Sequence, residues 1–310
     1  MTKKKYDVVV PGTYFCDMVF TGLPEVPELG KDVFASDFQM VPGGVYYPVA
    51  ILNQLGLKVG WKGQFGNDFF SRFMLDTIRE EGIDTSLIEI LDRSMRSLAA
   101  SFSFEHERGF VSYVEAPYLP LTCEDIEEFD TRCLLLPGLE NFWMDLHEIN
   151  RAKNRKDFII YQECQYNNLT VDSPGLVEAL STVDIFAPNE AEALRLTGYS
   201  NVEDAIAYLN RFVPLVVIKC GSKGAIAKQG AEIIRVPAIK VNVVDTTGAG
   251  DSFNAGFLFA YLADLSLETC LRYGAITGGL STTGPGLGEI PTWERLKEMV
   301  NEFEKHTVLQ

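Results

Sequence analysis

The sequence predicts an α/β fold, in which a doubly wound, mainly parallel sheet has helices on both faces and carries a small β-sheet lid. Runs of strand character alternate with runs of helical period through most of the chain, which is typical of a parallel sheet covered by helices. Two regions, residues 13–41 and 95–116, break this alternation with strands and turns alone. We therefore expect a single domain over residues 1–310, with these two regions inserted as the lid.

Each core element has its own signal in the chain. Apolar runs of strand length occupy residues 6–10, 58–63, 133–136, 157–162, 184–187 and 215–219. Between them, Phe69, Phe73 and Ile78 recur at a spacing that places them on one helix face. A second β patch follows at residues 225–228 and 232–236. Residues 293–303 predict a closing amphipathic helix, and the acidic run at 124–130 indicates a solvated helix face.

The lid contains a hairpin signal. Residues 97–104 and 110–114 alternate in polarity about the polar turn 105–109. A sheet this small cannot bury both of its faces by itself. It would serve as a lid over a site, as a dimer surface, or as both.

Composition and charge narrow the classes of function. The 310 residues are 46% hydrophobic, which supports a sizeable core. A formal net charge of -16 argues against a nucleic-acid or acidic-membrane partner, because either would require a basic surface. The apolar runs are shorter than the about 18 residues of a membrane helix, and the six cysteines show no paired spacing. We expect reduced thiols and a cytoplasmic protein.

The segment with the most chemical content is V-D-T-T-G-A-G-D at residues 244–251, followed by an apolar-periodic run. Small residues at a helix start leave backbone N–H groups free to converge on one point, where the helix dipole adds positive potential. Gly248, Ala249 and Gly250 would form such an anion hole. The Asp251 carboxylate beside it could take the proton of a substrate hydroxyl while the hole stabilises a transferring phosphoryl group.

This string also has a purely structural interpretation, a tight turn with Asp251 as the helix N-cap. Taken alone, the string favours neither interpretation. Residues 248–253 lack the third glycine of a dinucleotide fingerprint, and the chain contains no Gly-x-x-x-x-Gly-Lys-Ser/Thr loop. Residues 221–224 fall short of a nucleophile elbow. P-loop, Rossmann and serine-hydrolase chemistry are therefore disfavoured.

Four ordered motifs together resemble the ribokinase-like, or PfkB, family of carbohydrate and nucleoside kinases. Residues 244–251 look like its C-terminal signature Asp-Thr-x-Gly-Ala-Gly-Asp, and Gly43-Gly44 resembles its N-terminal Gly-Gly signature. Residues 188–192 are similar to its Asn-x-x-Glu element, and residues 218–224 resemble the strand and turn beneath its nucleotide. The motifs agree in order and spacing over nearly the whole chain.

The resemblance implies an ATP-dependent kinase that uses Mg²⁺. In the family the last aspartate of the C-terminal signature is the catalytic base, here Asp251, next to the Gly248-Ala249-Gly250 anion hole. The positions that correspond to the family's nucleotide contacts are Asn189, Lys219, Gly221, Ser222 and Gly224.

Other interpretations of these positions stay open. Glu190 falls where the family holds Mg²⁺ through water, but Asn189 and Glu190 would also suit an ordinary helix start. Both uses can coexist. Lys219 replaces a common threonine, so its role is undecided, and residues 221–224 would also suit a plain hairpin turn. The positions that surround a monovalent cation such as K⁺ in some members are Asp245, Thr247, Ser281, Gly284 and Gly286.

The acceptor site that the resemblance implies is altered in this chain. Its expected contacts are Asp17, Gly43, Gly44 and Glu140, the last of which would equally suit a loop charge. Where members often have asparagine, lysine and asparagine, this chain has Phe15, Val45 and Pro48. The pocket has therefore lost polar contacts. It gains aromatic contacts if Tyr14, Phe15, Tyr46 and Tyr47 face it, but these four residues would equally suit the core. Such a pocket favours a nucleoside over a plain pentose.

Together these observations predict transfer of the γ-phosphate of ATP to a hydroxyl of a small sugar, nucleoside or polyol. The resemblance also implies a homodimer joined through the lid. The alternative is a catalytically silent relative that binds nucleotide or sugar and has a regulatory role. Because a silent relative has no reason to keep Asp251 beside an intact anion hole, the sequence favours the enzyme.

Overall fold

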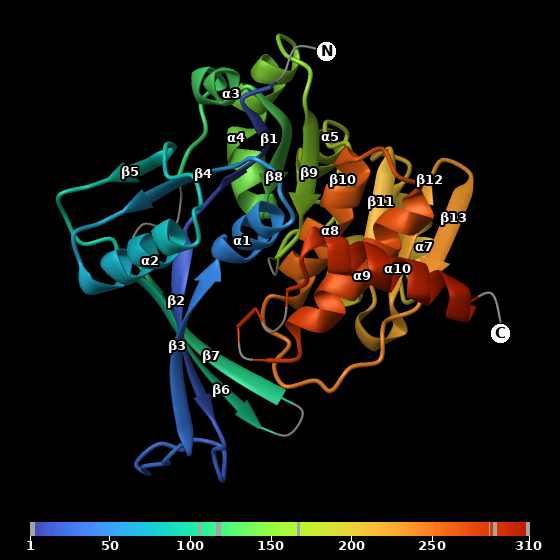
Figure 1. Ribbon diagram of the computed structural model, residues 1–310. Coiled ribbons are helices and arrows are strands. Elements are labelled where there is room, and N and C mark those ends of the chain that lie inside the picture. Colours follow the sequence, from blue (N-terminus) through green and yellow to red (C-terminus); the bar gives the residue numbers. More distant parts are fainter. Residues whose placement is uncertain are drawn as a thin grey trace.

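The computed structural model describes residues 4–104, 107–115, 119–165, 168–284, 286–287 and 290–307, with the backbone alone at 103–108, 140–144 and 303–307 within these ranges. A nine-stranded sheet and a four-stranded sheet form its frame (Figure 1). The strand order of the larger sheet is β13-β12-β11-β10-β9-β8-β1-β4-β5. The predicted doubly wound α/β core with a separate small sheet is confirmed.

Parallel pairing runs through the larger sheet from β5 to β11, and β12 is antiparallel to both of its neighbours. Its strands are β1 (Tyr6–Pro11), β4 (Val59–Phe65), β5 (Ile88–Ile90), β8 (Thr131–Leu136), β9 (Ile159–Glu163), β10 (Ile185–Ala187), β11 (Leu215–Lys219), β12 (Ala225–Gln229) and β13 (Glu232–Val236). Each predicted core strand is present, with ends that differ by no more than two residues. The short β5 was not predicted.

Helices cover both faces of this sheet because alternate strand residues point in opposite directions and are apolar on both sides. In β1, Val8 and Val10 pack on one face and Val9 on the other. The first face carries α1 (Tyr46–Gln54), α2 (Phe69–Glu80), α8 (Ala249–Leu262), α9 (Leu267–Ser281) and α10 (Trp293–Thr307). The second carries α3 (Cys123–Phe129), α4 (Leu139–Lys153), α5 (Leu176–Leu180), α6 (Glu190–Thr197) and α7 (Val202–Leu209).

The lid projects away from the core as a four-stranded sheet of order β3-β2-β6-β7 (Figure 1). Its strands are β2 (Tyr14–Thr21), β3 (Asp37–Gly44), β6 (Ser97–Phe104) and β7 (Glu107–Val114). β2 pairs antiparallel with β3 and parallel with β6. The predicted hairpin is formed by β6 and β7, and its turn residues 105–106 lie outside the described residues. β3 extends three residues beyond the predicted boundary at 41, to Gly44.

Tyr14 anchors the base of the lid to the core. Its hydroxyl donates a hydrogen bond to the carbonyl oxygen of Met95 at 2.8 Å and lies 2.8 Å from Ser71 Oγ. Its ring stacks on Phe65 with a centroid separation of 4.8 Å. Tyr14 is therefore a fully buried core residue that fixes where β2 leaves the large sheet.

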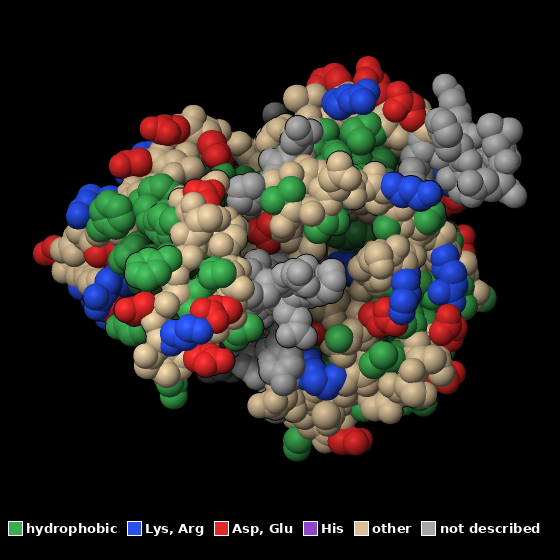
Figure 2. All heavy atoms as spheres, turned by 90° about the horizontal axis from the view of Figure 1, so that it is seen from below, with side chains coloured by type: hydrophobic (Ala, Val, Ile, Leu, Met, Phe, Trp, Pro, Cys, Tyr) green, Lys and Arg blue, Asp and Glu red, His purple; other side chains and the backbone are tan. Residues whose placement is uncertain are grey.

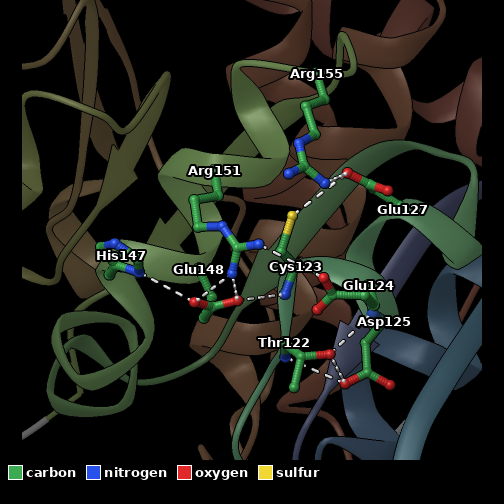
Figure 3. A network of polar contacts seen from close by, with 9 residues as sticks. All are labelled: Thr122, Cys123, Glu124, Asp125, Glu127, His147, Glu148, Arg151 and Arg155. Atoms are coloured by element: carbon green, nitrogen blue, oxygen red, sulfur yellow. Dashed lines mark hydrogen bonds and ion pairs between the residues drawn. The ribbon is translucent and has the colours of Figure 1, made fainter.

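A network of charged side chains joins α3 to α4 (Figure 3). Glu148 on α4 accepts a hydrogen bond from the backbone N–H of Cys123 and pairs with Arg151 at 2.9 Å. Arg155 pairs with Glu127 of α3 at 2.8 Å. The acidic run predicted as a solvated face is thus partly engaged in ion pairs, with Arg151 of α4 and with Arg155 just after that helix. These contacts hold α4 beside the carboxyl end of β8.

The face seen in Figure 2 carries Lys and Arg side chains interspersed with Asp and Glu, and hydrophobic side chains line a recess near its middle. Such a mixed surface offers no continuous basic patch among the coloured residues of this view. None of the helices in the described ranges is long and apolar enough to cross a bilayer.

Candidate active site

A cavity of about 160 Å³ opens at the carboxyl ends of β1 and β8. The strand order reverses there, since the chain continues to β4 and β5 on one side and to β9, β10 and β11 on the other. In open α/β sheets, ligands bind outside the strand ends at such a point. The cavity is lined by Pro11, Gly12, Thr13, Phe15, Gly44, Val45, Pro48, Leu119, Leu121, Leu136, Pro137, Gly138, Asp145, Gln165 and Asp251.

The amino-terminal end of α8 brings Asp251 to this cavity. Gly248 is the N-cap residue, with a φ of 71° that glycine adopts readily. The N–H of Ser252 donates to the Gly248 carbonyl at 2.8 Å, so Asp251 lies in the first helical turn and does not cap the helix. The interpretation of Asp251 as a structural N-cap is therefore wrong.

Three small residues precede Asp251 at this helix end, and they differ in their backbone contacts. The N–H of Ala249 meets the carbonyl oxygen of Thr246 at 3.3 Å, so it already has a backbone partner. Gly250 is exposed, and first-turn N–H groups have no carbonyl partner within the helix. Gly250 is thus the member of the predicted anion hole best placed to meet a ligand.

Asp251 sits above a buried polar cluster. One helical turn further, Asn254 donates from Nδ2 to Glu163 Oε1 at 2.7 Å. Asn254 Oδ1 accepts hydrogen bonds from Tyr161 at 2.9 Å and from Lys219 Nζ at 3.2 Å. The ends of β9 and β11 and the start of α8 therefore meet at one point.

Burial dominates the protonation of the two acids in this cluster. Loss of solvation raises the pKa of Asp251, while the nearby Lys219 ammonium and a hydrogen bond from Glu163 oppose the rise. Burial, and next the charge of Asp251, raise the pKa of Glu163 to about 8. The arrangement suits a general base, because carboxylates in such surroundings bind a proton more strongly than in water.

Lys219 lies at the predicted anion hole. A methyl group on Gly250 would lie 3.6 Å from Lys219 Nζ. The ammonium group is half-buried and is held in place by Asn254. A cation beside a helix start provides positive potential where a phosphoryl group would carry negative charge.

Asn189 and Glu190 begin α6, as the structural interpretation predicted. Asn189 is the N-cap, and Oδ1 accepts from the N–H of Glu192 at 2.8 Å in a capping box. Both Glu190 carboxylate oxygens accept from Lys223 Nζ, at 3.0 and 3.1 Å. The backbones of Asn189 and Lys219 form an isolated parallel β-bridge, which places this helix start beside the polar cluster.

The predicted nucleotide turn follows β11. Gly221 begins a 3-10 turn, η1 (Gly221–Lys223), with φ 56°, and open space faces its missing side chain. Gly224 has φ 93°, and a methyl group there would lie 2.0 Å from the carbonyl oxygen of Val236. Ser222, between them, is exposed. The two glycines therefore differ: Gly224 is required by packing, whereas Gly221 leaves room beside the backbone.

The predicted acceptor residues separate into two groups. Phe15 and Gly44 line the cavity, together with the substituted positions Val45 and Pro48. Asp17 is 8% exposed and lies outside the lining residues given above. Asp17 and Gly43 therefore form a second group, outside the residues that line this cavity.

Asp17 and Gly43 are in close contact. A methyl group on Gly43 would lie 2.3 Å from Asp17 Oδ2, so glycine is needed there. The Tyr47 hydroxyl donates to Asp17 Oδ2 at 3.3 Å. Burial raises the pKa of Asp17 to about 6. The hydrogen bond from Tyr47 lowers this pKa, while the charges of Asp245 and Asp251 raise it further.

The aromatic residues expected near the acceptor are mostly core residues. Tyr14, Tyr46 and Tyr47 are at most 5% exposed, and of the four aromatics Phe15 alone is among the described residues that line the cavity. β-strand alternation explains the difference between the neighbours Tyr14 and Phe15. Glu140 lies in the first turn of α4, and its side chain is outside the described residues.

The positions proposed for a monovalent cation lie on two segments that are hydrogen-bonded to each other. The N–H groups of Val244 and Asp245 donate to the carbonyl of Thr282, at 2.7 and 3.2 Å. Asp245 Oδ1 accepts from both the N–H and the hydroxyl of Thr247. Ser281 donates to Gly278 in its own helix, so its hydroxyl is turned away from the loop.

Several polar residues of the site were not predicted. Glu163, Asn254, Asp145 and Gln165 belong to the polar cluster or to the cavity wall. Asp145 is 7% exposed and accepts from the N–H of Leu121 at 3.1 Å. Asn254 follows Asp251 by one helical turn, so the i+3 spacing was the available signal. The other three carry no local signal.

Comparison with known proteins agrees with this geometry. A family profile described as pfkB family carbohydrate kinase matches residues 22–294. The ribokinase of Lactococcus lactis is 28% identical over 322 residues, covering 96% of this chain and 98% of that protein. The cytidine kinase of Thermococcus kodakarensis is 30% identical over 250 residues, covering 76% and 85%.

Solved structures show the same fold. The structure of a putative ribokinase II from E. coli, in complex with ATP and Mg²⁺, superposes with a TM-score of 0.79 at 21% identity, covering 96% of this chain and 99% of that one. The switch-point cavity, the glycine-rich start of α8 and the family match over residues 22–294 agree. The chain belongs to the pfkB family of carbohydrate kinases, phosphotransferases with an alcohol group as acceptor.

Proposed function

We propose that this protein transfers the γ-phosphoryl group of ATP to a hydroxyl group of a small sugar, nucleoside or polyol, with Asp251 as the general base. The observation that carries the proposal is the position of Asp251, which lines the cavity from the first turn of α8 beside Gly250 and the Lys219 ammonium. A base and a focus of positive charge thus lie at one point, as in-line phosphoryl transfer requires.

The proposed step moves one proton and one phosphoryl group. Asp251 accepts the proton of the acceptor hydroxyl while the hydroxyl oxygen attacks the γ-phosphorus. The new O–P bond forms while the bond from the γ-phosphorus to the bridging oxygen breaks, and ADP leaves with that electron pair. The Gly250 N–H and Lys219 Nζ stabilise the negative charge on the transferring group.

The side chains present suit the ions that the family uses. Glu190 offers two carboxylate oxygens, the ligand type that Mg²⁺ prefers, and would hold the ion through water after release from Lys223. Glu192, the glutamate that completes the Asn-x-x-Glu element begun at Asn189, offers the same type of ligand. Bound with ATP, Mg²⁺ would neutralise phosphate charge. The K⁺ site at Asp245, Thr247, Ser281, Gly284 and Gly286 stays a prediction, supported by the hydrogen bonds that link its two segments.

The cavity walls favour an acceptor with an apolar or aromatic part. Phe15, Val45, Pro48 and the leucines 119, 121 and 136 supply apolar surface, while Thr13, Gln165, Asp145 and Asp251 supply polar groups. Placed over an apolar wall, a nucleoside base would bury more surface than a pentose. We infer that nucleosides or base-like acceptors are preferred.

A homodimer through the lid and ATP as the donor complete the proposal. The lid edges are β3 and β7, which carry the exposed side chains Phe38, Phe110, Val111 and Tyr113. Exposed apolar residues on edge strands favour pairing with another copy. Light scattering behind a sizing column, with Val111→Asp as the disrupting variant, tests this assembly.

The test of the activity is ATP consumption with Mg²⁺ against nucleosides, pentoses, hexoses, sugar acids and inositols, with Asp251→Asn alongside. Turnover with one class of acceptor, lowered by about 10²- to 10⁴-fold in the variant, is expected for a general base. Full activity of Asp251→Asn would show that another group is the base. ATP binding without turnover of any acceptor would favour the silent relative.

A further inference from the structure

A second buried carboxyl group lies under the proposed base. Glu163 is the last residue of β9 and is 4% exposed. Its Oε1 atom accepts from Asn254 Nδ2 at 2.7 Å, and its carboxyl group shares a hydrogen bond with that of Asp251. Acidic side chains are rarely this deeply buried without a specific partner, so Glu163 requires an explanation that the proposed transfer step does not give.

Asn254 determines which Glu163 oxygen can carry a proton. Its Oδ1 atom accepts from the Tyr161 hydroxyl at 2.9 Å and from Lys219 Nζ at 3.2 Å. Because an ammonium group can only donate, the Asn254 amide has one consistent orientation, with Nδ2 toward Glu163. Oε1 of Glu163 must then be an acceptor. A proton on Glu163 would reside on Oε2, where it is available to Asp251.

The charged groups around Glu163 come from two elements. Asp251 faces it from α8 and Lys219 from β11, while Ala187, its strand partner on β10, brings no charge. Glu192 of α6 adds a further negative influence on Asp251. With both carboxyl groups ionised, one ammonium would face two negative charges, one on the buried Glu163 and one on the half-buried Asp251. A single shared proton makes this group of three neutral, and side-by-side carboxylates retain such a proton.

Both carboxyl groups bind a proton more strongly than in water, and their burial indicates which of them carries it. Burial and the Asp251 charge raise the pKa of Glu163 to about 8, whereas Lys219 and the Asn254 hydrogen bond lower it less. Burial raises the pKa of Asp251 as well, but Lys219 and the bond from Glu163 counteract this. Glu163 is 4% exposed, whereas Asp251 is half-buried at the cavity wall, so a negative charge costs less on Asp251 and the shared proton belongs on Glu163.

We propose that Glu163 is a positioning residue for the proposed phosphoryl transfer: its protonated carboxyl group, held by Asn254, donates a hydrogen bond that keeps the Asp251 carboxylate ionised and aimed at the acceptor hydroxyl. The inference rests on the proposed function for its catalytic meaning. The shared proton itself is a property of the free protein, so it can be measured without an acceptor.

Infrared difference spectroscopy of wild type against Glu163→Gln tests the proton directly. The wild type should show the carbonyl band of a buried protonated carboxyl group at pH 7, absent from the variant, and the band should fade as the pH rises through about 8. In Asp251→Asn the band should fade at a lower pH, because the neighbouring charge is gone. Absence of a protonated band in the wild type at pH 7 would overturn the inference.

Kinetics with the acceptor found in the panel test the positioning role. Glu163→Gln keeps a donor toward Asp251 and an acceptor toward Asn254, so kcat at pH 7 should stay within about threefold of wild type, as a preserved hydrogen bond implies. Wild-type kcat should fall above about pH 8, where Glu163 ionises, and the Gln variant should lack this fall. Glu163→Leu, which cannot donate, should lose about 10- to 100-fold in kcat.

These results separate the two proposals. If Asp251→Asn stays active, the proposed base is wrong whatever Glu163 does. If Asp251→Asn is inactive while Glu163→Gln has the same pH profile as wild type, the base stands and the role of Glu163 is wrong. If Glu163→Leu fails to fold, the pH profile of Glu163→Gln and the infrared band still test the role of Glu163.

Discussion

The ring of Tyr47 packs against Gly248, so that a methyl group on this glycine would lie 3.0 Å from the ring carbons. The same side chain donates its hydroxyl hydrogen bond to Asp17 and is 2% exposed. One buried tyrosine of α1 therefore contacts both the helix start that carries Asp251 and the acid predicted to bind the acceptor. Their spacing depends on how closely α1 and α8 approach each other.

Gly248→Ala should lower kcat by about 10²-fold, because a displacement of about 1 Å at a reacting group has that effect. The added methyl group meets the Tyr47 ring at a residue whose φ is 71°. Gly82→Ala is the matched control, since Gly82 has φ 68° and open space around it. The control should lose stability through backbone strain but keep kcat. Equal kcat values in the two variants would contradict the role of the Tyr47 contact.

Asp17→Asn should stabilise the protein at alkaline pH while it weakens acceptor binding. The folded-state pKa of Asp17, about 6, lies above the unfolded value of 3.8. Between pH 3.8 and 6 the folded protein therefore binds more protons than the unfolded chain, and its stability falls as the pH rises through this range. At pH 8 the ionised Asp17 therefore costs about 3 kcal/mol. The variant should gain about this much at pH 8, and the gain should vanish near pH 4.

Urea unfolding at several pH values measures this effect, with Asp37→Asn as a control on the exposed end of β3. The control should change the free energy of unfolding by less than about 0.5 kcal/mol at either pH. A gain in the free energy of unfolding of Asp17→Asn that is independent of pH, or that grows as the pH falls, would contradict the raised pKa of Asp17. A rise in the acceptor KM of the variant would link the cost of burial to function.

The parallel core could be predicted because its signals are local. The strand Leu215–Lys219 begins with four apolar residues that are all buried, and its predicted bounds are those observed. Gly248 to Asp251 were identifiable for the same reason, since a helix start and its charge lie within a few residues. β5 escaped prediction because three residues, two of them exposed, carry too little pattern.

The rest of the site depends on contacts between distant segments. Glu163 and Asn254 are 91 residues apart and meet because β9 ends where α8 begins, at one edge of the sheet. Asp145 reaches the cavity from the second turn of α4, which the network with α3 helps to hold in place. The packing of Tyr46 and Tyr47 also needed the tertiary structure, because a residue pattern cannot tell a core aromatic from a cavity wall.

Gly224→Ala should destabilise the nucleotide turn far more than Gly221→Ala. A methyl group at Gly224 would lie 2.0 Å from the Val236 carbonyl oxygen, at φ 93°, whereas Gly221 has φ 56° and open space. We expect a loss of at least about 2 kcal/mol in the free energy of unfolding for Gly224→Ala, and about 1 kcal/mol for Gly221→Ala, from left-handed backbone strain. Calorimetric titration with ATP should show weaker binding by Gly224→Ala. Equal unfolding midpoints would contradict the steric argument.

Phe15→Asn should shift acceptor preference from nucleosides toward pentoses. The substitution removes apolar surface from the cavity wall and offers amide groups to sugar hydroxyls. One lost aromatic contact should lower the kcat/KM of a nucleoside by about 10-fold or more relative to that of a pentose. Phe20→Asn on the same strand, outside the lining residues, is the control. A ratio that does not change in Phe15→Asn would remove Phe15 from the determinants of specificity.

Asp145→Asn should raise the KM of the acceptor by about 10- to 100-fold, the effect of losing a hydrogen bond to a charged group. Asp145 lines the cavity and accepts from the N–H of Leu121 through Oδ2, so its negative charge lies at the cavity wall, where a bound hydroxyl would meet it. The asparagine keeps the size of the side chain and can still accept from Leu121, which preserves the wall while it removes the charge. The KM of ATP should change little, because Asp145 lies on none of the segments assigned to the nucleotide. A variant with unchanged acceptor KM but a lower unfolding midpoint would show that Asp145 only holds α4 to the segment at Leu121.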